Sequence, residues 1–575
     1  MRRWWQRADV TVEGQVEAFR TAGLDFALDK SLLDAADVVV FRGDLRFGDR
    51  RAAAQVIYPP AFDLGEHPAV MAPGLEIGRH RSPDGLLCLD HVVMGEGEPM
   101  SGPEAVQRAE RLWELWETDR EQLAEEEADA ADPWANYVPH TPETALALID
   151  VGVSGHDAGY IHFGLDSLYP MRGAALRVRA THPRPVEIEI PGRANEVLRG
   201  DFELTGPWVR LSEHPPAPRD LLPWLRAEHA GVVERAVRAA AGLRGQHPEM
   251  PALVGFVYPD EGPGRGEVHD AWLFLVVRPD GRMELPRPFA ISSSERWLRQ
   301  PQLAGLAEAK VAIVGVGALG SQVADLLARA GVGEYVLVDN DIVTPGNRVR
   351  HELDLADIGR AKTQAVGDRV RRVNPWAVVT TSEARLGTPF TGAAQVAGIQ
   401  RADDDLVALL GGCDVIVNAT ANGSASAYLS AIAAESGTPI VHSYVSAGAW
   451  GARVLVQRPG ESACWDCLAW WCEDTGEGDG DATRETVPAV AEEHRHEVVM
   501  ERGCADPTFT GPGLELTAAA AAVARAAVGI ALGGDGYPEP DFDLATLRFR
   551  EQDTQRGAAD YRRLPVHERC TTCRR

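Results

Sequence analysis

Two cysteines of this sequence stand apart from the others. Cys88 lies in "RSPDGLLCLD" and Cys504 in "ERGCADPTFT", loops of small and polar residues more than 400 positions apart, and neither belongs to a C-x-x-C pair. A thiolate is a strong nucleophile and a good leaving group, so two accessible thiols can pass an acyl group from one to the other. The plainer interpretation, an inert small side chain at each position, stays open on these residues alone.

Four further cysteines form two C-x-x-C pairs, Cys464 with Cys467 and Cys570 with Cys573. Four thiolates in this arrangement suit a tetrahedral Zn²⁺ ion. About a hundred residues separate the two pairs, so a shared metal would fasten the C-terminal tail to an earlier part of the chain. A redox role for either pair is the alternative. Cys472 lies close enough in sequence to compete as a ligand.

Three glycines follow the pattern G-x-G-x-x-G between a predicted strand and a predicted helix, namely Gly315, Gly317 and Gly320. Such glycines let the backbone turn tightly and approach a phosphate at the N-terminus of the helix. Asp339, 24 positions after Gly315, ends the next predicted strand and suits a ribose hydroxyl. On these residues alone NAD is the default ligand, and helix–sheet packing is the structural alternative.

The residues beyond that strand favour a more highly charged ligand. They add a second acidic residue, an amide and three basic side chains, namely Asp341, Asn347, Arg348, Arg350 and Lys362. Each cation alone is ordinarily a solvated surface charge. Together they fit a triphosphate, whose negative charge must be neutralised, better than they fit a dinucleotide.

The stretch from Gly315 to Pro375 resembles the adenylating enzymes of the ThiF and ubiquitin-activating family. The family pattern runs G-x-G-x-x-G, D-x-D, S-N-L-x-R-Q, a lysine and R-x-N-P, and the matches here are Asp339, Asp341, Asn347, Arg350, Lys362 and "RVNP". The resemblance implies that these residues bind ATP with Mg²⁺. An upstream "ERWLRQPQL" is similar to the family's R-Y-x-R-Q segment and implies that Arg299 reaches the ATP of a dimer partner. Ala421 in "NATANG" departs from the family, which has an acidic magnesium contact there.

The same resemblance extends to the cysteines. The family shares the paired C-x-x-C motifs, and its members carry an acyl-accepting cysteine in an N-C-A-x-x-G-type segment before a helix. Cys504 precedes such a helix, in the stretch "TAAAAAVARAAVGIALGG", so the resemblance implies that Cys504 is the nucleophile. We expect this stretch to be a buried helix and not a membrane span, because Arg525 interrupts it.

The segment "YPPAFDLGEHPAVMAPGLEIGRHRSPDGLLCLD" resembles ubiquitin-conjugating enzymes. Their meander ends in a Y-P-x-x-P turn and leads to G-x-I-C-L-D, which Gly85, Cys88, Leu89 and Asp90 match. The resemblance implies that Cys88 is the active thiol. The family's Asn falls at His80, eight positions before the cysteine, where a His either donates to the oxyanion of aminolysis or is a plain loop residue.

Several modules are needed to position these residues. A chain of 575 residues is expected to fold as three or four domains. We predict an α+β ubiquitin-conjugating-like domain over 1–135, with a helix over 103–128, and an α/β linker domain of short strands over 136–290. Over 291–575, alternating strands and helices predict a doubly wound α/β domain of the ThiF adenylation type.

The overall charge makes some partners improbable. The chain has 57 Lys and Arg against 85 Asp and Glu, a formal net charge of −28, which repels the phosphates of nucleic acids. Its N-terminus lacks the apolar core of a signal peptide. We therefore expect a cytoplasmic protein with neither a nucleic-acid nor a membrane partner.

The two resemblances together imply a relay. ATP would activate the C-terminal carboxylate of a partner protein, Cys504 would take the acyl group as a thioester, and Cys88 would receive it by transthiolation and deliver it to a target amine. The layout resembles fused proteins of bacterial CBASS antiphage operons. It implies a homodimer, and as partner a cGAS/DncV-like nucleotidyltransferase or a ubiquitin-like protein. The alternatives are a sulfur-carrier-type adenylyltransferase and a non-catalytic scaffold, the latter prompted by Ala421.

Overall fold

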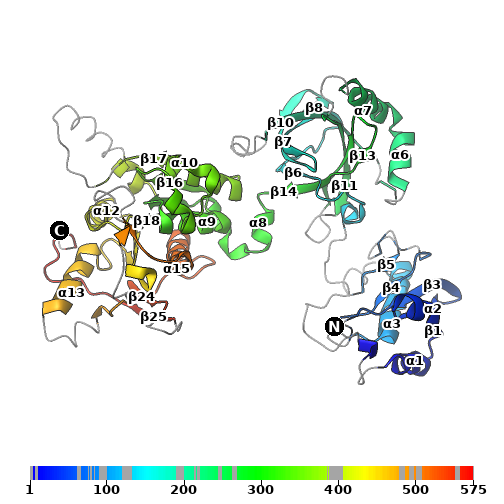
Figure 1. Ribbon diagram of the computed structural model, residues 1–575, viewed down its shortest axis with the longest axis horizontal. Coiled ribbons are helices and arrows are strands. Elements are labelled where there is room, and N and C mark those ends of the chain that lie inside the picture. Colours follow the sequence, from blue (N-terminus) through cyan, green and yellow to red (C-terminus); the bar gives the residue numbers. More distant parts are fainter. Residues whose placement is uncertain are drawn as a thin grey trace. The chain divides into compact units, whose positions relative to one another are not determined.

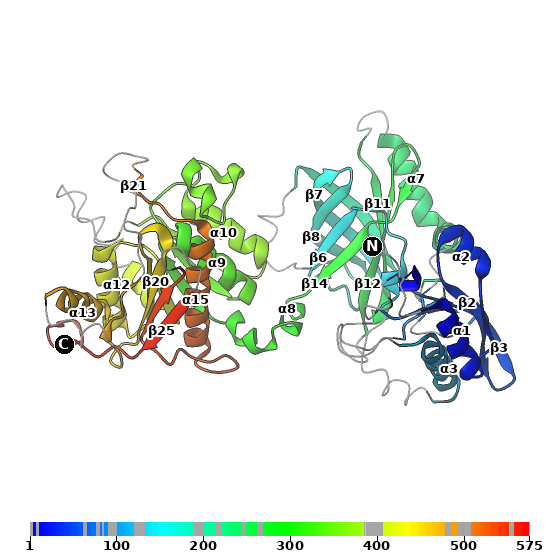
Figure 2. The same ribbon diagram turned by 60° about the horizontal axis from the view of Figure 1, so that its bottom comes forward.

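The structure is a computed structural model of the chain (Figures 1 and 2). It describes residues 4–6, 11–60, 62, 66–75, 77, 81–82, 85–89, 100–119, 133–188, 200–212, 215–216, 220–243, 249–261, 268–384, 386, 406–477, 486–490, 498–499, 508–550 and 557–573. The chain divides into two compact units, Met1–Ile188 with Gly200–Ala290, and Glu189–Arg199 with Ile291–Arg575.

The first sheet is an antiparallel meander of five strands paired in chain order. Its strands are β1 (Phe26–Leu28), β2 (Val40–Phe47), β3 (Arg50–Ile57), β4 (Ala69–Met71) and β5 (Leu86–Leu87), and its helices are α1 (Val12–Thr21), α2 (Lys30–Ala36) and α3 (Gly102–Thr118). Alternate residues of β3 are buried in one hydrophobic cluster with the inner face of α3. The period of two along the strand therefore sets which face packs on the helix.

α3 begins at a capping box and is shorter than predicted. The Ser101 hydroxyl accepts a hydrogen bond from the Glu104 N–H, and the Glu104 carboxylate accepts one from the Ser101 N–H. The helix ends at Thr118, with Asp119 as its C-cap. The expected end at residue 128 is therefore wrong by ten residues, and positions 120–128 lie outside the described residues.

The second sheet has nine strands and is mostly antiparallel. Its strands are β6 (Ala145–Ile149), β7 (Ala158–Leu168), β8 (Met171–His182), β9 (Val186–Ile188), β10 (Phe202–Arg210), β11 (Ala252–Glu261), β12 (Val268–Val277), β13 (Met283–Glu284) and β14 (Arg287–Ile291). Parallel pairing is described between β10 and β11 and between β6 and β8. α6 (Leu221–Glu228) and α7 (Ala230–Leu243) lie outside the curled sheet (Figure 1). The region predicted as an α/β linker domain of short strands is thus α+β with long, mostly antiparallel strands, so that prediction is wrong.

The third sheet has eight strands in the order β17-β16-β15-β18-β19-β20-β24-β25. Its parallel strands are β15 (Lys310–Val314), β16 (Glu334–Val338), β17 (Val378–Ser382), β18 (Val415–Asn418) and β19 (Ile440–Val445). The antiparallel strands β20 (Gly451–Gln457), β24 (Leu544–Arg548) and β25 (Ala558–Arg562) extend one side. The helices are α9 (Ala318–Ala330), α10 (Lys362–Val373), α12 (Gly423–Ser436), α13 (Trp465–Glu477) and α15 (Gly513–Leu532).

Helices cover both faces of this sheet, which confirms the doubly wound prediction. Val311 and Ile313 of β15 belong to a buried cluster with α9, α10 and α15. Ala312 and Val314, the residues between and after them, belong to a second cluster with Leu429 of α12. β15 is therefore buried on both sides, which is why its sequence reads as a continuous apolar run.

α15 is long and apolar enough to cross a membrane by length and composition, with a mean hydropathy of 1.5 in its most apolar window. It packs on α9 and on β18, β19 and β20. Ala519, Ala520 and Val523 are fully buried in the cluster beneath α9. These contacts make α15 a core helix of the third sheet, as predicted for the alanine-rich stretch.

Substituting an aspartate on the buried side of α15 is expected to unfold this unit. Ala520→Asp would bury a carboxylate without a partner, and we expect it to lower the free energy of unfolding by about 3–5 kcal/mol. The matched control Ala518→Asp lies on the exposed side of the same helix and should change it by less than about 0.5 kcal/mol. Chemical denaturation followed by circular dichroism measures both, and equal stability of the two variants would contradict the core placement.

Candidate nucleotide site and cysteine sites

The glycine turn lies at the switch point of the parallel strands. β15 has β16 on one side and β18 on the other, so the loops after these strands diverge at their carboxyl ends, where open α/β sheets bind ligands. Gly315 has a φ of +84°, and a Cβ there would lie 2.8 Å from the carbonyl carbon and oxygen of Ala419. A Cβ on Gly320 would lie 1.9 Å from the Gly315 oxygen. A Cβ on Gly317 would meet nothing within 4 Å, so the turn is open on that side.

Asp339, directly after β16, shapes the two loops that meet at this turn. Its Oδ2 accepts a hydrogen bond of 2.9 Å from the Val316 N–H, and its Oδ1 accepts one of 2.9 Å from the Asp341 N–H. Burial raises the pKa of Asp339, and the positive charge of Lys362 opposes that rise. Each carboxylate oxygen keeps a second lone pair, so the predicted bond to a ribose hydroxyl remains available.

Lys362 and Asp341 form an ion pair beside the glycine turn. The Lys362 Nζ lies 2.8 Å from the Asp341 Oδ2, and the Lys362 N–H donates to the Asp341 carbonyl oxygen at 2.9 Å. Lys362 is the first residue of α10, and its side chain is 11% exposed. The structure therefore brings Lys362 to Asp339 and Asp341, although Lys362 lies 21 positions after Asp341 in the sequence.

Asn347 and Arg350 belong to the short helix η6 (Pro345–Val349) and its C-cap. The Asn347 Oδ1 accepts a hydrogen bond of 2.9 Å from the Thr344 N–H, which leaves the Asn347 amide N–H₂ as the group to offer a ligand. The Arg350 carbonyl oxygen accepts a bond of 3.0 Å from the Gln322 Nε2 of α9. The segment that contains Asn347 and Arg350 is thus hydrogen-bonded to α9, the helix that follows the glycine turn.

Sequence reasoning missed two side chains that hold this segment, Gln322 and His351. The His351 Nε2 lies 2.8 Å from the Val316 carbonyl oxygen, and Gln322 is buried. One signal pointed to His351, which occupies the last position of the family's S-N-L-x-R-Q pattern, where a Gln is expected. No sequence pattern pointed to Gln322, which lies inside a helix.

The "RWLRQ" segment forms α8 (Glu295–Leu298) and its C-cap, Arg299, which is exposed. Its other arginine, Arg296, donates from Nη1 to the Asn374 Oδ1 at 3.1 Å. The Arg296 guanidinium also stacks 4.3 Å from the Trp297 ring centroid and 4.9 Å from that of Trp376. "RWLRQ" and "RVNP" therefore contact each other in the fold through Arg296 and Asn374, and the role of Arg299 toward a second copy's ATP stays a prediction.

Ala421 stands in a tightly bonded loop after β18. Its φ is +52°, and it is exposed. The Asn418 Oδ1 accepts hydrogen bonds from the hydroxyl and the N–H of Thr420, at 2.8 Å and 3.1 Å, and the Asn422 side chain caps α12. The Asn418 Nδ2 donates to the buried His442 Nδ1 at 2.9 Å. Residues 418–422 offer no carboxylate, so this loop lacks the acidic magnesium contact that the resemblance implies.

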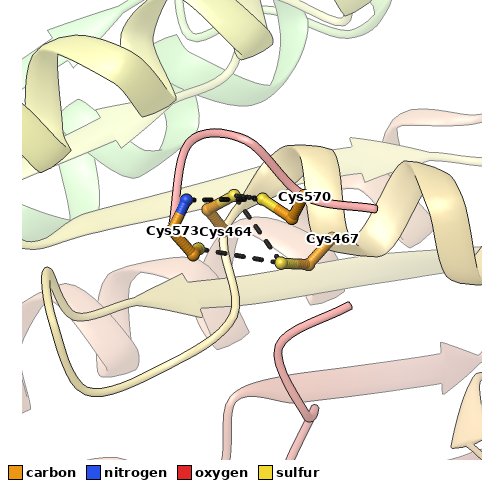
Figure 3. A group of neighbouring side chains, drawn as sticks. All are labelled: Cys464, Cys467, Cys570 and Cys573. Atoms are coloured by element: carbon orange, nitrogen blue, oxygen red, sulfur yellow. Dashed lines mark hydrogen bonds between the residues drawn. The ribbon is translucent and has the colours of Figure 1, made fainter. Parts of the chain in front are cut away.

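The four predicted metal-binding cysteines form one cluster (Figure 3). Their sulfur atoms all lie within 4.8 Å of one another, with described sulfur–sulfur distances of 3.4 Å for Cys464 to Cys570, 3.8 Å for Cys464 to Cys467 and 3.7 Å for Cys467 to Cys573. Zn–S bonds of about 2.3 Å give a tetrahedron with edges of about 3.8 Å. The cluster of the four predicted cysteines therefore fits a structural zinc ion.

The pKa values of the cluster's thiols diverge, because the hydrogen bond to Cys467 and burial raise the pKa of Cys464, and burial raises that of Cys573. Hydrogen bonds from the Cys464 thiol and from the His567 N–H lower the pKa of Cys467 to about 5, although burial opposes this. His567 in turn lies 2.9 Å from the Asp474 carboxylate through its Nε2. Cys472 is not a member of the cluster, because its sulfur accepts a bond of 3.3 Å from Arg453.

Cys88 follows β5 and is exposed. The turn before it depends on Gly85, whose φ is +91° and whose Cβ would lie 2.5 Å from the Pro73 Cα. After it, the Leu89 carbonyl oxygen accepts a hydrogen bond of 3.3 Å from the Arg108 guanidinium of α3. The sulfur is thus accessible, held between a glycine turn and a cation on the neighbouring helix.

Two predicted site residues, His80 and Cys504, lie outside the described residues, as does Asp90. The flanks of Cys504 are described: β21 (Val498–Val499) pairs antiparallel with β23 (Thr508–Phe509). Gly511 approaches Ala449 so closely that a Cβ would lie 2.9 Å from the Ala449 Cβ. The chain after Cys504 is therefore anchored before it enters α15.

Removing one ligand of the cysteine cluster is expected to release the metal. Cys570→Ser should lose the bound zinc and lower the melting temperature, because the C-terminal tail is no longer fastened to α13. Metal content by atomic emission and thermal unfolding by calorimetry measure the two effects. The control Cys413→Ser removes a buried thiol that donates to the Leu409 carbonyl oxygen, away from the cluster, and should retain zinc. Zinc retained by Cys570→Ser would contradict the assignment.

Comparison with known proteins places this geometry in a family. Residues 294–563 match the ThiF family. The chain is 27% identical over 519 residues to the protein y4oA of Sinorhizobium fredii, covering 84% of this chain and 83% of y4oA. It is 33% identical over 165 residues to the sulfur carrier protein ThiS adenylyltransferase of Escherichia coli, covering 28% of this chain and 59% of that protein.

A further relative is the ubiquitin-like modifier-activating enzyme 5 of Drosophila mojavensis, 30% identical over 162 residues, which cover 27% of this chain and 39% of that enzyme. The match to this enzyme and that to the ThiS adenylyltransferase each cover less than two thirds of the relative. The C-terminal part of this chain, over residues 294–563, is a ThiF-family domain.

Proposed function

We propose that the chain is an ATP-dependent enzyme that activates the C-terminus of a partner protein and passes it over two of its own cysteines to a target amine. The ThiF-family domain supports the activation step. The names of two relatives, which describe a modifier-activating enzyme and an adenylyltransferase of a sulfur carrier protein, support a protein as substrate. The observation that carries the proposal is the Lys362–Asp341 ion pair beside the open glycine turn.

The ion pair supports ATP as the ligand in preference to NAD. An ammonium group has three donors and acts as a compact charge, so Lys362 can exchange Asp341 for phosphate oxygens when a triphosphate enters. Arg350 adds a second positive charge, Asn347 an amide donor, and Asp339 an acceptor for a ribose hydroxyl. Asp341, released by Lys362, is the carboxylate that would hold Mg²⁺, which neutralises charge on the polyphosphate when bound.

In the first step, a carboxylate oxygen of the partner's C-terminus attacks the α-phosphorus of ATP, and pyrophosphate leaves. The products are pyrophosphate and a mixed anhydride of the partner with AMP. A free carboxylate resists nucleophiles because of its negative charge, whereas the anhydride has a neutral carbonyl and a good leaving group. Lys362 and Arg350 stabilise the charge on the phosphates during this step.

Two sulfurs then carry the acyl group. The Cys504 thiolate attacks the activated carbonyl and AMP leaves, which gives a thioester. The Cys88 thiolate attacks this thioester, and the Cys504 thiolate leaves. A target amine finally attacks the Cys88 thioester, forming an amide and releasing the Cys88 thiolate, with His80 proposed as an oxyanion donor.

The N-terminal unit supports the conjugating step. Its meander leads to Cys88 through the motif matched by Gly85 and Leu89, and the sulfur is exposed. An exposed thiol can meet an extended peptide, which a relay requires. We therefore propose that residues 1–135 form a ubiquitin-conjugating-like domain and 136–290 a linker domain, ahead of the adenylation domain at 291–575.

We further propose a CBASS-type antiphage conjugation system, with a cGAS/DncV-like nucleotidyltransferase or a ubiquitin-like protein as the activated partner. The support is the order of the modules, with the conjugating-like part ahead of the adenylating part. Failure of both partner types to form any adduct would exclude this assignment.

We propose that the adenylation domain acts as a homodimer. Val349, Leu355 and Leu514 are 74%, 67% and 83% exposed. Val349 and Leu514 are neighbours in space, because a Cβ on Gly513 would lie 2.9 Å from the Val349 oxygen. A second copy would cover this apolar edge, and the exposed Arg299 is the proposed contact with that copy's ATP. A monomer in sedimentation equilibrium would exclude it.

The name of the ThiS adenylyltransferase favours one alternative, a sulfur-carrier-type reaction in which the activated carboxylate receives sulfur. That reaction gives Cys88 no role. A Cys88→Ala variant with full activity would favour it.

The activation step predicts ATP–pyrophosphate exchange that depends on the partner. We expect Lys362→Ala to slow this exchange by about 100-fold, because a charge-stabilising group is lost. The control Lys310→Ala removes a lysine at the start of β15 that lies 3.9 Å from Glu334, and should exchange at the wild-type rate. Exchange by Lys362→Ala at the wild-type rate would contradict the assigned site, and absence of exchange in the wild type would favour a scaffold.

The relay predicts thiol-labile adducts on non-reducing gels after incubation with Mg-ATP and a partner that ends in Gly or Ala. Wild type should form an adduct that reductant removes, and Cys413→Ala should behave in the same way. Cys504→Ala should form none, because Cys88 is loaded only from Cys504. Cys88→Ala should keep the adduct on Cys504 and lose the amide product.

Each variant separates one step from the next. An adduct on Cys88 in the Cys504→Ala variant would contradict the order of transfer. Amide product formed by Cys88→Ala at the wild-type rate would remove Cys88 from the reaction.

A further inference from the structure

A buried histidine lies directly beneath the glycine turn. His351 is 8% exposed, and its Nε2 lies 2.8 Å from the Val316 carbonyl oxygen. A carbonyl oxygen only accepts, so the Nε2 carries the hydrogen and the Nδ1 carries a lone pair. That Nδ1 is buried and has no hydrogen-bond partner among the described residues. Burial lowers the pKa of His351 to about 4, so the ring is a neutral donor at physiological pH.

The two peptide groups that flank Val316 are each held by one hydrogen bond. The Val316 N–H donates to the Asp339 Oδ2 at 2.9 Å, and the Val316 carbonyl oxygen accepts from His351. The cis peptide bonds found in the described residues lie elsewhere, at Tyr169–Pro170 and His182–Pro183, so the Val316–Gly317 bond is trans. In a trans peptide the carbonyl and the next N–H point in opposite directions. Drawing the Val316 oxygen toward His351 therefore aims the Gly317 N–H away from His351.

Gly317 is the residue at which the turn is open. It is the N-cap of α9, and a Cβ there would meet nothing within 4 Å. A backbone N–H at this position faces the place where an anion meets the helix N-terminus. If the Val316–Gly317 peptide flipped, a carbonyl oxygen would face the anion, and the two negative charges would repel each other.

His351 is itself held in place by α9. The Gln322 side chain of α9 donates to the Arg350 oxygen at 3.0 Å, and the Glu352 N–H donates to the Ser321 Oγ at 3.4 Å. Both neighbours of His351 in the chain are therefore hydrogen-bonded to the first turns of the helix that the glycine turn begins. Asp339, His351 and α9 therefore act on one short loop, and His351, held by α9, is the side chain bonded to the Val316–Gly317 peptide group.

We propose that His351 is a positioning residue for the triphosphate: it holds the Val316 carbonyl oxygen away from the ligand and so presents the Gly317 N–H to a phosphate. The inference deepens the proposed function, because it rests on ATP being the ligand of this turn. Arg350, one residue earlier, supplies charge to the same ligand, so one short segment carries both the cation and the group that orients the turn.

The test compares ATP with adenosine in the full-length chain. Isothermal titration with Mg-ATP, and displacement of a fluorescent ATP analogue by adenosine, give the two dissociation constants for wild type, His351→Gln and His351→Leu. His351→Leu removes the donor, and we expect its Kd for ATP to rise about tenfold while its Kd for adenosine changes by less than about twofold. His351→Gln restores an N–H donor of similar reach and should bind ATP within about threefold of wild type.

The outcomes separate this inference from the proposed function. If wild type binds Mg-ATP and His351→Leu binds it equally well, only the inference fails. It also fails if His351→Leu weakens ATP and adenosine equally, since that result indicates a packing role, or if His351→Gln is no better than His351→Leu. If wild type binds no Mg-ATP, the proposed function fails, and the inference fails too because it rests on ATP as the ligand.

Discussion

The contact between Gly315 and the backbone after β18 is the constraint around which the C-terminal unit is arranged. With Ala419 atoms 2.8 Å from the place of a Cβ, no side chain fits at Gly315, and the loops after β15 and β18 close on each other. Asp339 then joins the loop after β16 to the same turn. Lys362 reaches the turn through Asp341, and Arg350 through Gln322. The residues of the candidate nucleotide site come from separate parts of the sequence, and all of them connect to one short turn at the switch point of the parallel sheet.

A second constraint fixes the later part of the chain. The cysteine cluster joins α13 to a tail about a hundred residues further on. Zinc in such sites contributes on the order of 10 kcal/mol, comparable to the stability of a whole domain. α15, packed on α9 and the strands, fixes the other side. Cys504 lies in the sequence between these two anchored elements, α13 and α15, which suits the role proposed for it.

Sequence patterns predicted those parts of the molecule that local rules determine. The apolar run of β15, the glycine spacing and the C-x-x-C spacing are each visible within a few residues of sequence, and the structure shows a buried strand, a tight turn and a cluster of four cysteines there. The prediction for the linker sheet was wrong, because the sequence of a strand does not determine whether it pairs with its neighbours parallel or antiparallel. Gln322 and His351 were missed, since their partners lie 28 and 35 positions away and no periodicity marks them. Arg299 and Arg296 look alike in sequence, and only the fold shows that Arg296 contacts Asn374.

The central claim is that a triphosphate binds at the glycine turn and engages the segment from Asp341 to Lys362. Hydrogen–deuterium exchange of the full-length protein tests it most directly, with Mg-ATP, NAD or no ligand present. The account predicts that Mg-ATP slows exchange in peptides that cover 315–322 and 341–362, and that NAD leaves both unchanged. Equal protection by NAD, or protection by Mg-ATP confined to other parts of the chain, would contradict it.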